Sequence, residues 1–352
     1  MSAAGRQGGG HGRRVSAIVV NYEGGSALVD CLTSLVEQPG LLETIVVDNG
    51  SADGSVAAAR ERYPDLVVIE PGRNLGFAGG ANAGARVARG DLLLFFNPDV
   101  RVARGAIVAL ASAFDRRDVG VAGPIVNRSG TLEFGATIDA FGFPVALSRP
   151  RRPLYVSGCA LMTPRELFEE LGGFDERFFM FVEDVDYCWR VLLRGRDVRV
   201  VAQATVAHEG GASARGGYVT EEGLSTTAFR VVLRERNALA TLLKCYRLPS
   251  LAAVLPLYVL QSLATAAALA AAGRTRTATG VVGGLWWNVR ELPRTLELRR
   301  MVQRSRELGD RNVLLRLHCG VQKITLLREF GLPPVDESLA LPPRAPRPEA
   351  RT

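Results

Sequence analysis

Residues 15–49 read VSAIVVNYEGGSALVDCLTSLVEQPGLLETIVVDN, and their pattern indicates the fold class. Two runs rich in Val and Ile, 15–21 and 43–49, enclose a segment at 27–38 whose apolar residues recur at helical spacing. Strand, helix and strand in this order are typical of a parallel sheet, because two parallel strands need a crossover connection. The alternation continues with a helical pattern at 55–63 and with apolar runs at 66–69, 92–96, 119–126, 156–162 and 198–206. The sequence therefore predicts an α/β fold whose first half is Rossmann-like.

Polar residues end three of the predicted strands, at Asn21-Tyr22, Asp48-Asn49 and Asn97-Pro98-Asp99. In open α/β sheets ligands bind beyond the carboxyl ends of the strands, so these residues are the first candidates for a binding site. The turn after the first strand reads NYEGG and is not the Gly-x-Gly-x-x-Gly turn that binds a dinucleotide. The sequence therefore disfavours a dehydrogenase.

A glycine-rich stretch, NLGFAGGANAG at 74–84, follows the third strand and opens a helix. Its small residues, Gly79 among them, would let backbone N–H groups approach a diphosphate. The same glycines would equally permit tight packing of the helix on the sheet. The sequence leaves both interpretations open.

A second acidic cluster lies in GGFDERFFMFVEDVDYCWR at 172–190. A helix that begins near Val182 and turns three side chains to the core is predicted by the four-residue spacing of Phe181, Val185 and Trp189. Its first turn then holds Glu183, Asp184 and Asp186. Acids in that position complement the helix dipole and cap free N–H groups, so the cluster alone does not distinguish a structural role from a chemical one.

His208 closely follows the apolar run at 198–206, much as Asp99 follows the run at 92–96. A lone histidine is more often structural than a ligand. A carboxylate and an imidazole at neighbouring strand ends could nevertheless hold one divalent cation, with diphosphate oxygens and water as further ligands. Mixed oxygen and nitrogen ligands suit Mn²⁺ or Mg²⁺, so the sequence presents a metal site here as a hypothesis.

The composition is that of a globular protein with a basic end. Of the 352 residues 47% are hydrophobic, and the five cysteines form no Cys-x-x-Cys pair, so neither a disulfide framework nor a zinc knuckle is indicated. Residues 1–14 are Gly-rich and polar without an apolar core, which predicts a disordered tail and not a signal peptide. The net charge of +7 is carried by residues 274–352, which hold 15 Lys or Arg and 8 Asp or Glu.

An uncharged stretch of 26 residues, 248–273, reads LPSLAAVLPLYVLQSLATAAALAAAG and is long enough to span a bilayer. Pro249 and Pro256 interrupt its first half, which leaves an embedded or interfacial helix as an alternative to a true span. A buried core helix would be equally apolar. Trp286 and Trp287 follow as interfacial anchors would, and they are not interleaved with the Arg-rich tail as in a nucleic-acid binder. We therefore expect contact with a membrane surface and none with nucleic acid.

The ordered set of motifs resembles the inverting family 2 glycosyltransferases of the GT-A fold, particularly the bacterial rhamnosyltransferase-like branch. The resemblance covers about residues 15–213 and depends on six motifs in order. They are VDNGSADGS (47–55), NLGFAGGANAG (74–84), FNPDV (96–100), SGCALM (157–162), GGFDERFFMFVEDVD (172–186) and HEGGAS (208–213). The implied fold is a mixed, mostly parallel GT-A sheet with helices on both faces and a C-terminal apolar helical appendage. The expected parts are a tail at 1–14, a catalytic domain at 15–240, membrane-associated helices at 241–300, and a basic helix with a Pro/Arg-rich tail at 301–352.

The resemblance implies a role for each candidate residue. Asp99 takes the position of the metal ligand that holds the sugar-nucleotide diphosphate, and His208 matches a second ligand found in some members. Asn97 stands where the commoner Asp-x-Asp pattern has its first acid, which leaves the site one charge short. Asp184 matches the usual catalytic base, and Glu183 precedes it in a Glu-Asp pair. The implied donor-binding positions are Tyr22, Asp48, Asn49, Arg73, Asn74, Gly79 and Asn97.

The implied enzyme inverts the anomeric carbon of a nucleoside-diphosphate sugar, with the help of Mn²⁺ or Mg²⁺. Rhamnose or another hexose would pass to a saccharide or polyprenyl-linked acceptor in cell-wall or surface-polysaccharide assembly, at the cytoplasmic face of the membrane. Two alternatives stay open. A sugar-1-phosphate nucleotidyltransferase would need a Gly-rich loop where this chain has Asn21-Tyr22-Glu23, and a non-catalytic sugar-binding scaffold would have lost the acids that persist here.

Overall fold

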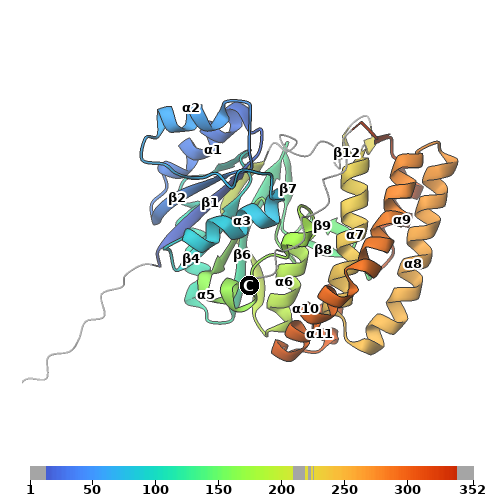
Figure 1. Ribbon diagram of the computed structural model, residues 1–352. Coiled ribbons are helices and arrows are strands. Elements are labelled where there is room, and N and C mark those ends of the chain that lie inside the picture. The colour runs from blue at the N-terminus through green and yellow to red at the C-terminus, as the bar shows by residue number, and fades with distance from the viewer. Residues whose placement is uncertain (1–12, 209–218, 221–222, 225, 339–352) are drawn as a thin grey trace, which may run out of the picture.

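The computed structural model describes residues 13–208, 219–220, 223–224 and 226–338 (Figure 1). Most of the N-terminal tail expected at 1–14, the motif HEGGAS beyond His208 and the end of the Pro/Arg-rich tail lie outside the described residues. Within that range a large sheet with helices forms one half of the molecule, and a group of helices forms the other (Figure 1).

The main sheet has nine strands, in the order β3-β2-β1-β4-β10-β6-β11-β5 with β7 paired to β6. Strands β1, β2, β3, β4, β6 and β11 run in one direction, whereas β5, β7 and β10 run antiparallel to their partners. The predicted mixed, mostly parallel sheet is therefore confirmed. The strand bounds are β1 Val15–Asn21, β2 Leu41–Asp48, β3 Val67–Ile69, β4 Leu92–Phe96, β5 Val100–Val102, β6 Val119–Arg128, β7 Thr131–Glu133, β10 Ala160–Pro164 and β11 Asp197–His208.

Helices cover both faces of this sheet, because the strands are apolar on both sides. In β1, Ile18 belongs to one hydrophobic cluster and Val19 to the other. The Ile18 side packs under α3 (Gly76–Val87), α5 (Arg165–Glu170) and α6 (Glu183–Leu193), and the Val19 side under α1 (Gly25–Val36), α2 (Ser55–Arg62) and α4 (Ala106–Ser112).

Smaller elements are the 3₁₀ turns Ala113–Asp115 and Glu176–Phe178 and the strand pairs β8 (Ala136–Ile138) with β9 (Pro144–Ala146), β12 (Val219–Thr220) with β13 (Gly223–Leu224), and β14 (Thr226–Thr227) with β15 (Val335–Asp336).

The glycines of α3 serve close packing of that helix on the sheet. A Cβ atom at Gly84 would lie 2.4 Å from Cγ2 of Ile18, and one at Gly80 would lie 2.8 Å from Cγ1 of Val20. Real Cβ atoms do not approach other atoms so closely. Of the two interpretations left open by the sequence, helix–sheet packing therefore explains these two positions.

The remaining helices form a layer beside the sheet (Figure 1). They are α7 (Ala228–Cys245), α8 (Leu248–Ala271), α9 (Thr275–Arg290), α10 (Leu292–Ser305), α11 (Asp310–Leu314) and α12 (Gln322–Phe330). Helix α7 contacts α6 on one side and α9 and α10 on the other, and α8 packs on α9. Since α7 runs through residue 240, it joins the sheet domain to the helical layer instead of ending between them.

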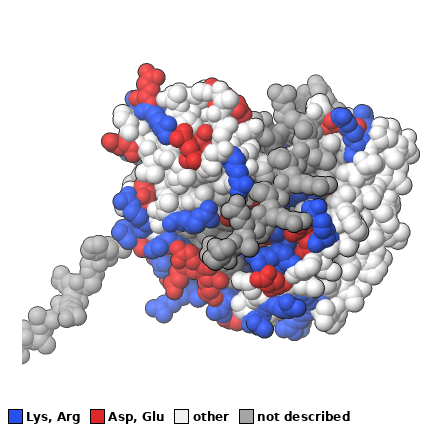
Figure 2. All heavy atoms as spheres, in the orientation of Figure 1, with Lys and Arg blue, Asp and Glu red and all other residues white. Residues whose placement is uncertain are grey.

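Helix α8 is, among the described residues, the one helix long and apolar enough to cross a membrane, with a mean hydropathy of 1.7. Only a narrow stripe of it is buried, at Tyr258, Ser262, Ala266 and Leu269. On the other side Leu257 is 54% exposed and Leu260 is 65% exposed. Figure 2 shows the result as a broad surface without Lys, Arg, Asp or Glu at the right of the molecule, where α8 lies.

Candidate functional site

A cavity of about 330 Å³ opens where β1, β4 and β11 end. This is the place where ligands bind in open α/β sheets. The cavity brings together eight of the predicted site residues, which come from six separate segments of the chain. They are Tyr22, Asn49, Asn74, Asn97, Asp99, Glu183, Asp184 and His208.

Three predicted donor-binding residues, Asp48, Arg73 and Gly79, are not among the residues that line the cavity. Asp48 is buried, and its carboxylate accepts hydrogen bonds from Asn21 Nδ2 at 3.0 Å and from the Ser51 backbone N–H at 3.1 Å. Gly79 lies inside α3, where a Cβ atom would meet Leu75 at 2.8 Å. Arg73 is exposed. Their geometry favours structural roles for Asp48 and Gly79.

Two asparagines of the cavity fix the beginning of α3. Asn49 Nδ2 donates to the Gly76 carbonyl at 3.0 Å, and Asn49 Oδ1 accepts from the Leu75 N–H at 3.2 Å. Asn74 Oδ1 accepts from the Gly76 N–H at 2.8 Å. The nitrogen and the oxygen of the Asn49 side-chain amide thus both bond to the backbone of α3, so this residue shapes the cavity wall.

Asp99 and His208 meet at one side of the cavity. Oδ1 of Asp99 lies 3.1 Å from Nε2 of His208, and Nδ2 of Asn97 lies 3.4 Å from the same nitrogen. The other ring nitrogen, Nδ1, lies 2.7 Å from Nη1 of Arg128. Nε of Arg128 donates a hydrogen bond to the Glu133 carboxylate at 3.1 Å. The predicted carboxylate and imidazole are therefore adjacent, although Asp99 and His208 come from distant parts of the sequence.

The contacts of His208 fix its tautomer. Burial of the ring opposes its charge, but Cys159 and Asp99 outweigh burial and raise the pKa of His208 to about 10. A guanidinium can only donate, so the contact with Arg128 requires a bare Nδ1 and hence a neutral ring. Protonation of Nδ1 would place two donors face to face, so the ring is neutral wherever the contact with Arg128 forms. Nε2 then carries the proton and donates a hydrogen bond to Asp99.

The chemistry of this pair suits a divalent cation, because a carboxylate oxygen and an imidazole nitrogen converge on one edge of the cavity. A cation on Nε2 would need the proton on Nδ1, so Arg128 would have to withdraw from that nitrogen. Within the described residues, no group of three or more His, Cys, Asp or Glu side chains is close enough to hold a metal ion. Among the described residues, Asp99 and His208 are thus the two candidate ligands, with diphosphate oxygens and water as further ones.

The segment that leads into α6 has a strained backbone. Phe179, Phe181 and Val182 have φ values of 65°, 69° and 71°. Positive φ is costly for residues with a side chain, and most of all for a β-branched residue such as Val182. Gly76 leaves room for this segment, since a Cβ atom there would lie 2.1 Å from the Phe179 carbonyl oxygen. Phe181 was predicted to face the core but is only partly buried and lines the cavity.

Helix α7 holds this strained segment in place. Nδ2 of Asn237 donates to the carbonyls of Phe178, Met180 and Phe181 at 3.0, 3.0 and 2.8 Å. Nη2 of Arg236 donates a hydrogen bond to the Phe178 carbonyl at 2.9 Å. Neither residue is predictable from the sequence, because both lie more than 50 positions beyond the segment in a helix with no recognisable motif.

Glu183 and Asp184, the first two residues of α6, face the cavity. Asp184 accepts hydrogen bonds from the N–H groups of Gly158 at 2.9 Å and Val185 at 2.8 Å. Burial raises the pKa of Asp184 above its usual range, against the effect of these donors. Burial also raises the pKa of Glu183 well above its usual range, and the charge of Asp184 raises it further. Oε2 of Glu183 is buried without a hydrogen-bond partner among the described residues.

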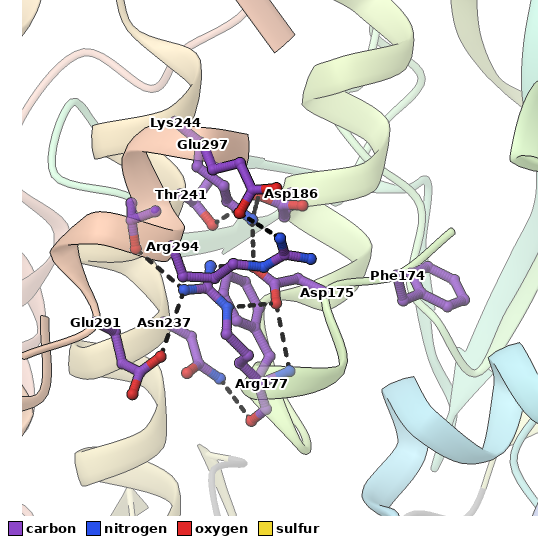
Figure 3. A network of polar contacts seen from close by, with 12 residues as sticks. Phe174, Asp175, Arg177, Asp186, Asn237, Thr241, Lys244, Glu291, Arg294 and Glu297 are labelled. Carbon is purple, nitrogen blue, oxygen red and sulfur yellow. Dashed lines mark hydrogen bonds and ion pairs between the residues drawn. The ribbon is translucent and has the colours of Figure 1, made fainter. Parts of the chain in front are cut away.

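Asp186 faces away from the cavity into a buried ionic network (Figure 3). Its carboxylate lies 2.9 Å from Nε of Arg190 and 2.7 Å from Nζ of Lys244. Lys244 also lies 2.7 Å from Asp175, and Arg177 supports Asp175 at 2.7 Å. Lys244 and Arg177 together hold the pKa of Asp175 far below its usual range, although burial opposes them. The network joins α6 and α7 to the segment before α6.

Comparisons with known proteins agree with this geometry. Residues 16–172 match the model of glycosyl transferase family 2. An N-acetylglucosaminyl-diphospho-decaprenol L-rhamnosyltransferase of Mycobacterium tuberculosis is 31% identical over 230 residues, which cover 54% of this chain and 74% of the relative. The low-salt glycan biosynthesis hexosyltransferase Agl10 of Haloferax volcanii is 28% identical over 192 residues, which cover 50% of this chain and 61% of that protein.

A solved structure, GalNAc-T7 with UDP, GalNAc and Mn²⁺, is similar in fold. The TM-score is 0.54 at 16% identity, and the match covers 66% of this chain and 48% of that one. At this identity the likeness concerns the fold alone, and it confirms the predicted GT-A architecture. Together with the sequence relatives it establishes that the chain belongs to glycosyl transferase family 2 and is a glycosyltransferase.

Proposed function

We propose that the protein transfers rhamnose or another hexose from a nucleoside-diphosphate donor to a saccharide carried on an isoprenoid diphosphate, in the assembly of a cell-wall or surface polysaccharide. The observation that carries the proposal is one cavity lined both by the adjacent Asp99 and His208 and by the buried Glu183 with the half-buried Asp184. The name of the Mycobacterium tuberculosis relative supports this acceptor class and this sugar.

Asp184 is the proposed proton acceptor for the attacking hydroxyl of the acceptor sugar. A base works best when its pKa lies close to the working pH, and burial moves the pKa of Asp184 in that direction. The N–H groups of Gly158 and Val185 stabilise the carboxylate and fix its orientation. Glu183, with the more strongly raised pKa, keeps its proton while Asp184 is ionised, because two adjacent buried carboxylates do not both carry charge.

The reaction inverts the anomeric carbon in this proposal, because the hydroxyl activated by Asp184 attacks from the face opposite the leaving diphosphate. Asp99 and His208 are the residues that would hold a divalent cation, Mn²⁺ or Mg²⁺. Such a cation supplies positive charge where the leaving nucleoside diphosphate becomes more negative. Tyr22 and Asn74, at the cavity wall, are the proposed contacts of the nucleoside part.

The acceptor class implies work at a membrane, on its cytoplasmic face, where we place the protein. The exposed side of α8 supports this proposal, because contiguous apolar surfaces of this extent mark interaction sites. Trp286 is 67% exposed beside it in α9, as an interfacial anchor would be. Sedimentation with phospholipid vesicles at high salt tests this, since an apolar attachment survives salt that releases an electrostatic one.

A donor screen tests the function most broadly. Purified protein is incubated with each nucleoside-diphosphate sugar and with lipid-linked saccharide extracts, and the released nucleoside diphosphate is measured. We expect release with one donor class only, dependent on the acceptor. Release that never depends on an acceptor, with any donor, would contradict the proposal.

Asp99→Ala tests the role of the cavity edge. We expect the donor that the screen identifies to bind about 10-fold or more weakly in the presence of Mn²⁺, because the variant removes the anionic ligand. The measurement is calorimetric titration with and without EDTA, with the exposed Asp30→Ala as matched control. Equal donor affinity of Asp99→Ala and the wild-type protein in Mn²⁺ would assign Asp99 a purely structural role.

A further inference from the structure

Two arginines of α7 line the cavity on the side of Glu183 and Asp184. They are Arg230 and Arg234, one helical turn apart on the same face of α7. The guanidinium carbon of Arg230 lies 4.7 Å from the centre of the Phe181 ring, and that of Arg234 lies 5.6 Å from it. Phe181, two residues before Glu183, is therefore a shared platform that orients both guanidinium groups.

These arginines do not neutralise the acidic pair. Within the described part of the chain, neither Glu183 nor Asp184 forms an ion pair, and the pKa of each stays raised although Arg234 favours the charged forms. The third arginine of the cavity, Arg128, contacts His208 and Glu133 on the side of the proposed cation site. The cavity thus has one cationic group beside His208 and a separate pair of cationic groups over Phe181, near Asp184.

The position of Arg230 and Arg234 relative to the apolar helices α8 and α9 indicates which substrate these arginines would bind. Helix α7 lies between the sheet domain and the layer of α8 and α9 (Figure 1). Its other face packs tightly on α9, where a Cβ atom at Gly280 would lie 2.5 Å from Val232. Tyr258 of α8 donates a hydrogen bond of 2.6 Å to the carbonyl of Glu235. The same helix therefore presents arginines to the cavity and carries the apolar layer.

We infer that Arg230 and Arg234 form a subsite for the diphosphate of the acceptor, with its isoprenoid chain running toward the apolar layer of α8 and α9. Guanidinium groups bind phosphate oxygens through paired, charge-assisted hydrogen bonds, and a diphosphate offers oxygens to two such groups. With its diphosphate at this subsite, the sugar of the acceptor has its hydroxyl groups near Asp184. The inference builds on the proposed function, because it assumes that the acceptor is an anionic lipid-linked sugar.

The test uses full-length protein and farnesyl diphosphate, which has the anionic group and a short isoprenoid chain but neither sugar nor nucleotide. Binding is measured by calorimetry in EDTA, so that a diphosphate cannot bind through a cation at Asp99 and His208. For Arg230→Gln and Arg234→Gln we expect Kd to rise about 10-fold each, as for loss of one charge-assisted contact. Arg234→Lys should bind more tightly than Arg234→Gln but more weakly than the wild-type protein, because lysine keeps the positive charge but lacks the paired N–H donors of a guanidinium group.

Three outcomes would overturn the inference. One is equal Kd values in the wild-type protein and both Gln variants, with Arg300→Gln on the exposed side of α10 as matched control and Tm as the check on folding. The second is equally tight binding of farnesol, which would assign affinity to the chain alone. The third is binding that requires Mn²⁺, which would place the probe on the donor side.

Different experimental results would disprove the proposed function and the proposed subsite. If the protein binds farnesyl diphosphate through the two arginines but transfers no sugar to any lipid-linked acceptor, the function is wrong and the subsite stands. If the Arg230→Gln/Arg234→Gln double variant transfers sugar to a lipid-linked acceptor with the wild-type KM, the subsite is wrong and the function stands.

Discussion

The first turn of α6 contains acidic side chains in two different environments, the cavity and a buried ionic network, and the sequence does not distinguish them. Glu183 and Asp184 face the cavity without an ion pair among the described residues, and burial raises the pKa of both. Asp186, two positions further on, is fully buried between Arg190 and Lys244. Helical geometry separates Asp184 from Asp186, because positions two apart lie on nearly opposite sides of a helix. Acids of one helical turn are thus the proposed site of proton transfer on one side of α6 and part of a buried ionic network on the other.

The strained segment before α6 makes this difference possible. Positive φ values at Phe179, Phe181 and Val182 turn the chain so that α6 begins at the cavity wall. Asn237 and the network around Lys244 hold that turn from α7 (Figure 3). The side of α6 that carries the ionic network therefore supports the geometry of the side that faces the cavity, because a strained backbone persists only where the surrounding structure holds it.

The largest effect is expected for Asp184→Asn. The amide keeps the shape but cannot accept the proton, so kcat should fall about 10²-fold to 10⁴-fold. Donor affinity should stay within about threefold of the wild-type value, since the proposed donor site lies at the other side of the cavity. Release of nucleoside diphosphate and donor titration by calorimetry measure the two effects. Parallel loss of donor affinity would show that Asp184 serves binding instead.

For Asp186→Asn we expect a loss of stability with little direct effect on chemistry. The variant leaves Arg190 and Lys244 buried with one fewer negative charge, and breaking a buried pair in this way costs about 3–5 kcal/mol. Urea unfolding measures the change. The matched control is Asp30→Asn, which removes an exposed ion pair of 2.8 Å and should cost at most about 1 kcal/mol. Similar losses for the two variants would remove the distinction between the two sides of α6.

Asn237→Ala should separate positioning from binding. Three carbonyls of the strained segment lose their common donor, so Glu183 and Asp184 should be less well placed and kcat should fall about 10-fold or more. The KM for the donor should stay unchanged. Asn288→Ala is the matched control, because Asn288 is also buried and donates to two carbonyls but does not touch this segment. The same kcat loss in both variants would mean general destabilisation.

The smallest effect is expected for Glu183→Gln, in thermal stability. The pKa of Glu183 is higher in the folded than in the unfolded chain, so the folded state binds the proton more tightly. Stability therefore falls as pH rises above the unfolded pKa of about 4.3, and glutamine removes this loss. We expect Tm of the variant to exceed the wild-type value by about 2 °C at pH 8 and to equal it near pH 4. A Tm difference that does not change between these pH values would contradict a raised pKa.

Much of the fold and half of the site were predictable from local patterns. Polar residues at the ends of β-strands predicted Asp99 and His208, because parallel strands bring their carboxyl ends to one edge. The start of α6 near Val182 followed from helical spacing, and α6 begins at Glu183. These features depend on residues close together in the sequence or on a general rule of sheet topology.

The rest could not be predicted, for physical reasons. The diphosphate and packing interpretations of Gly79 both require the absence of a Cβ atom, so only the neighbouring Leu75 could decide between them. Asp48 ends a strand as Asp99 does, but the position of Ser51 determines that its carboxylate is used internally. Arg230 and Asn237 act across more than 45 residues of sequence, and an amphipathic helix gives no local sign of which polar side chain will meet which carbonyl or ring.

The most direct test of the account is the single-turnover rate of sugar transfer for Asp184→Asn and Asp186→Asn side by side, with saturating donor and acceptor and at equal concentrations of folded protein. The account predicts that Asp184→Asn is slower than the wild-type protein by about 10²-fold or more. Folded Asp186→Asn should keep its rate within about 10-fold, because its carboxylate does not reach the cavity. A wild-type rate for Asp184→Asn, or an equal loss in both variants, would contradict the division of roles within the first turn of α6.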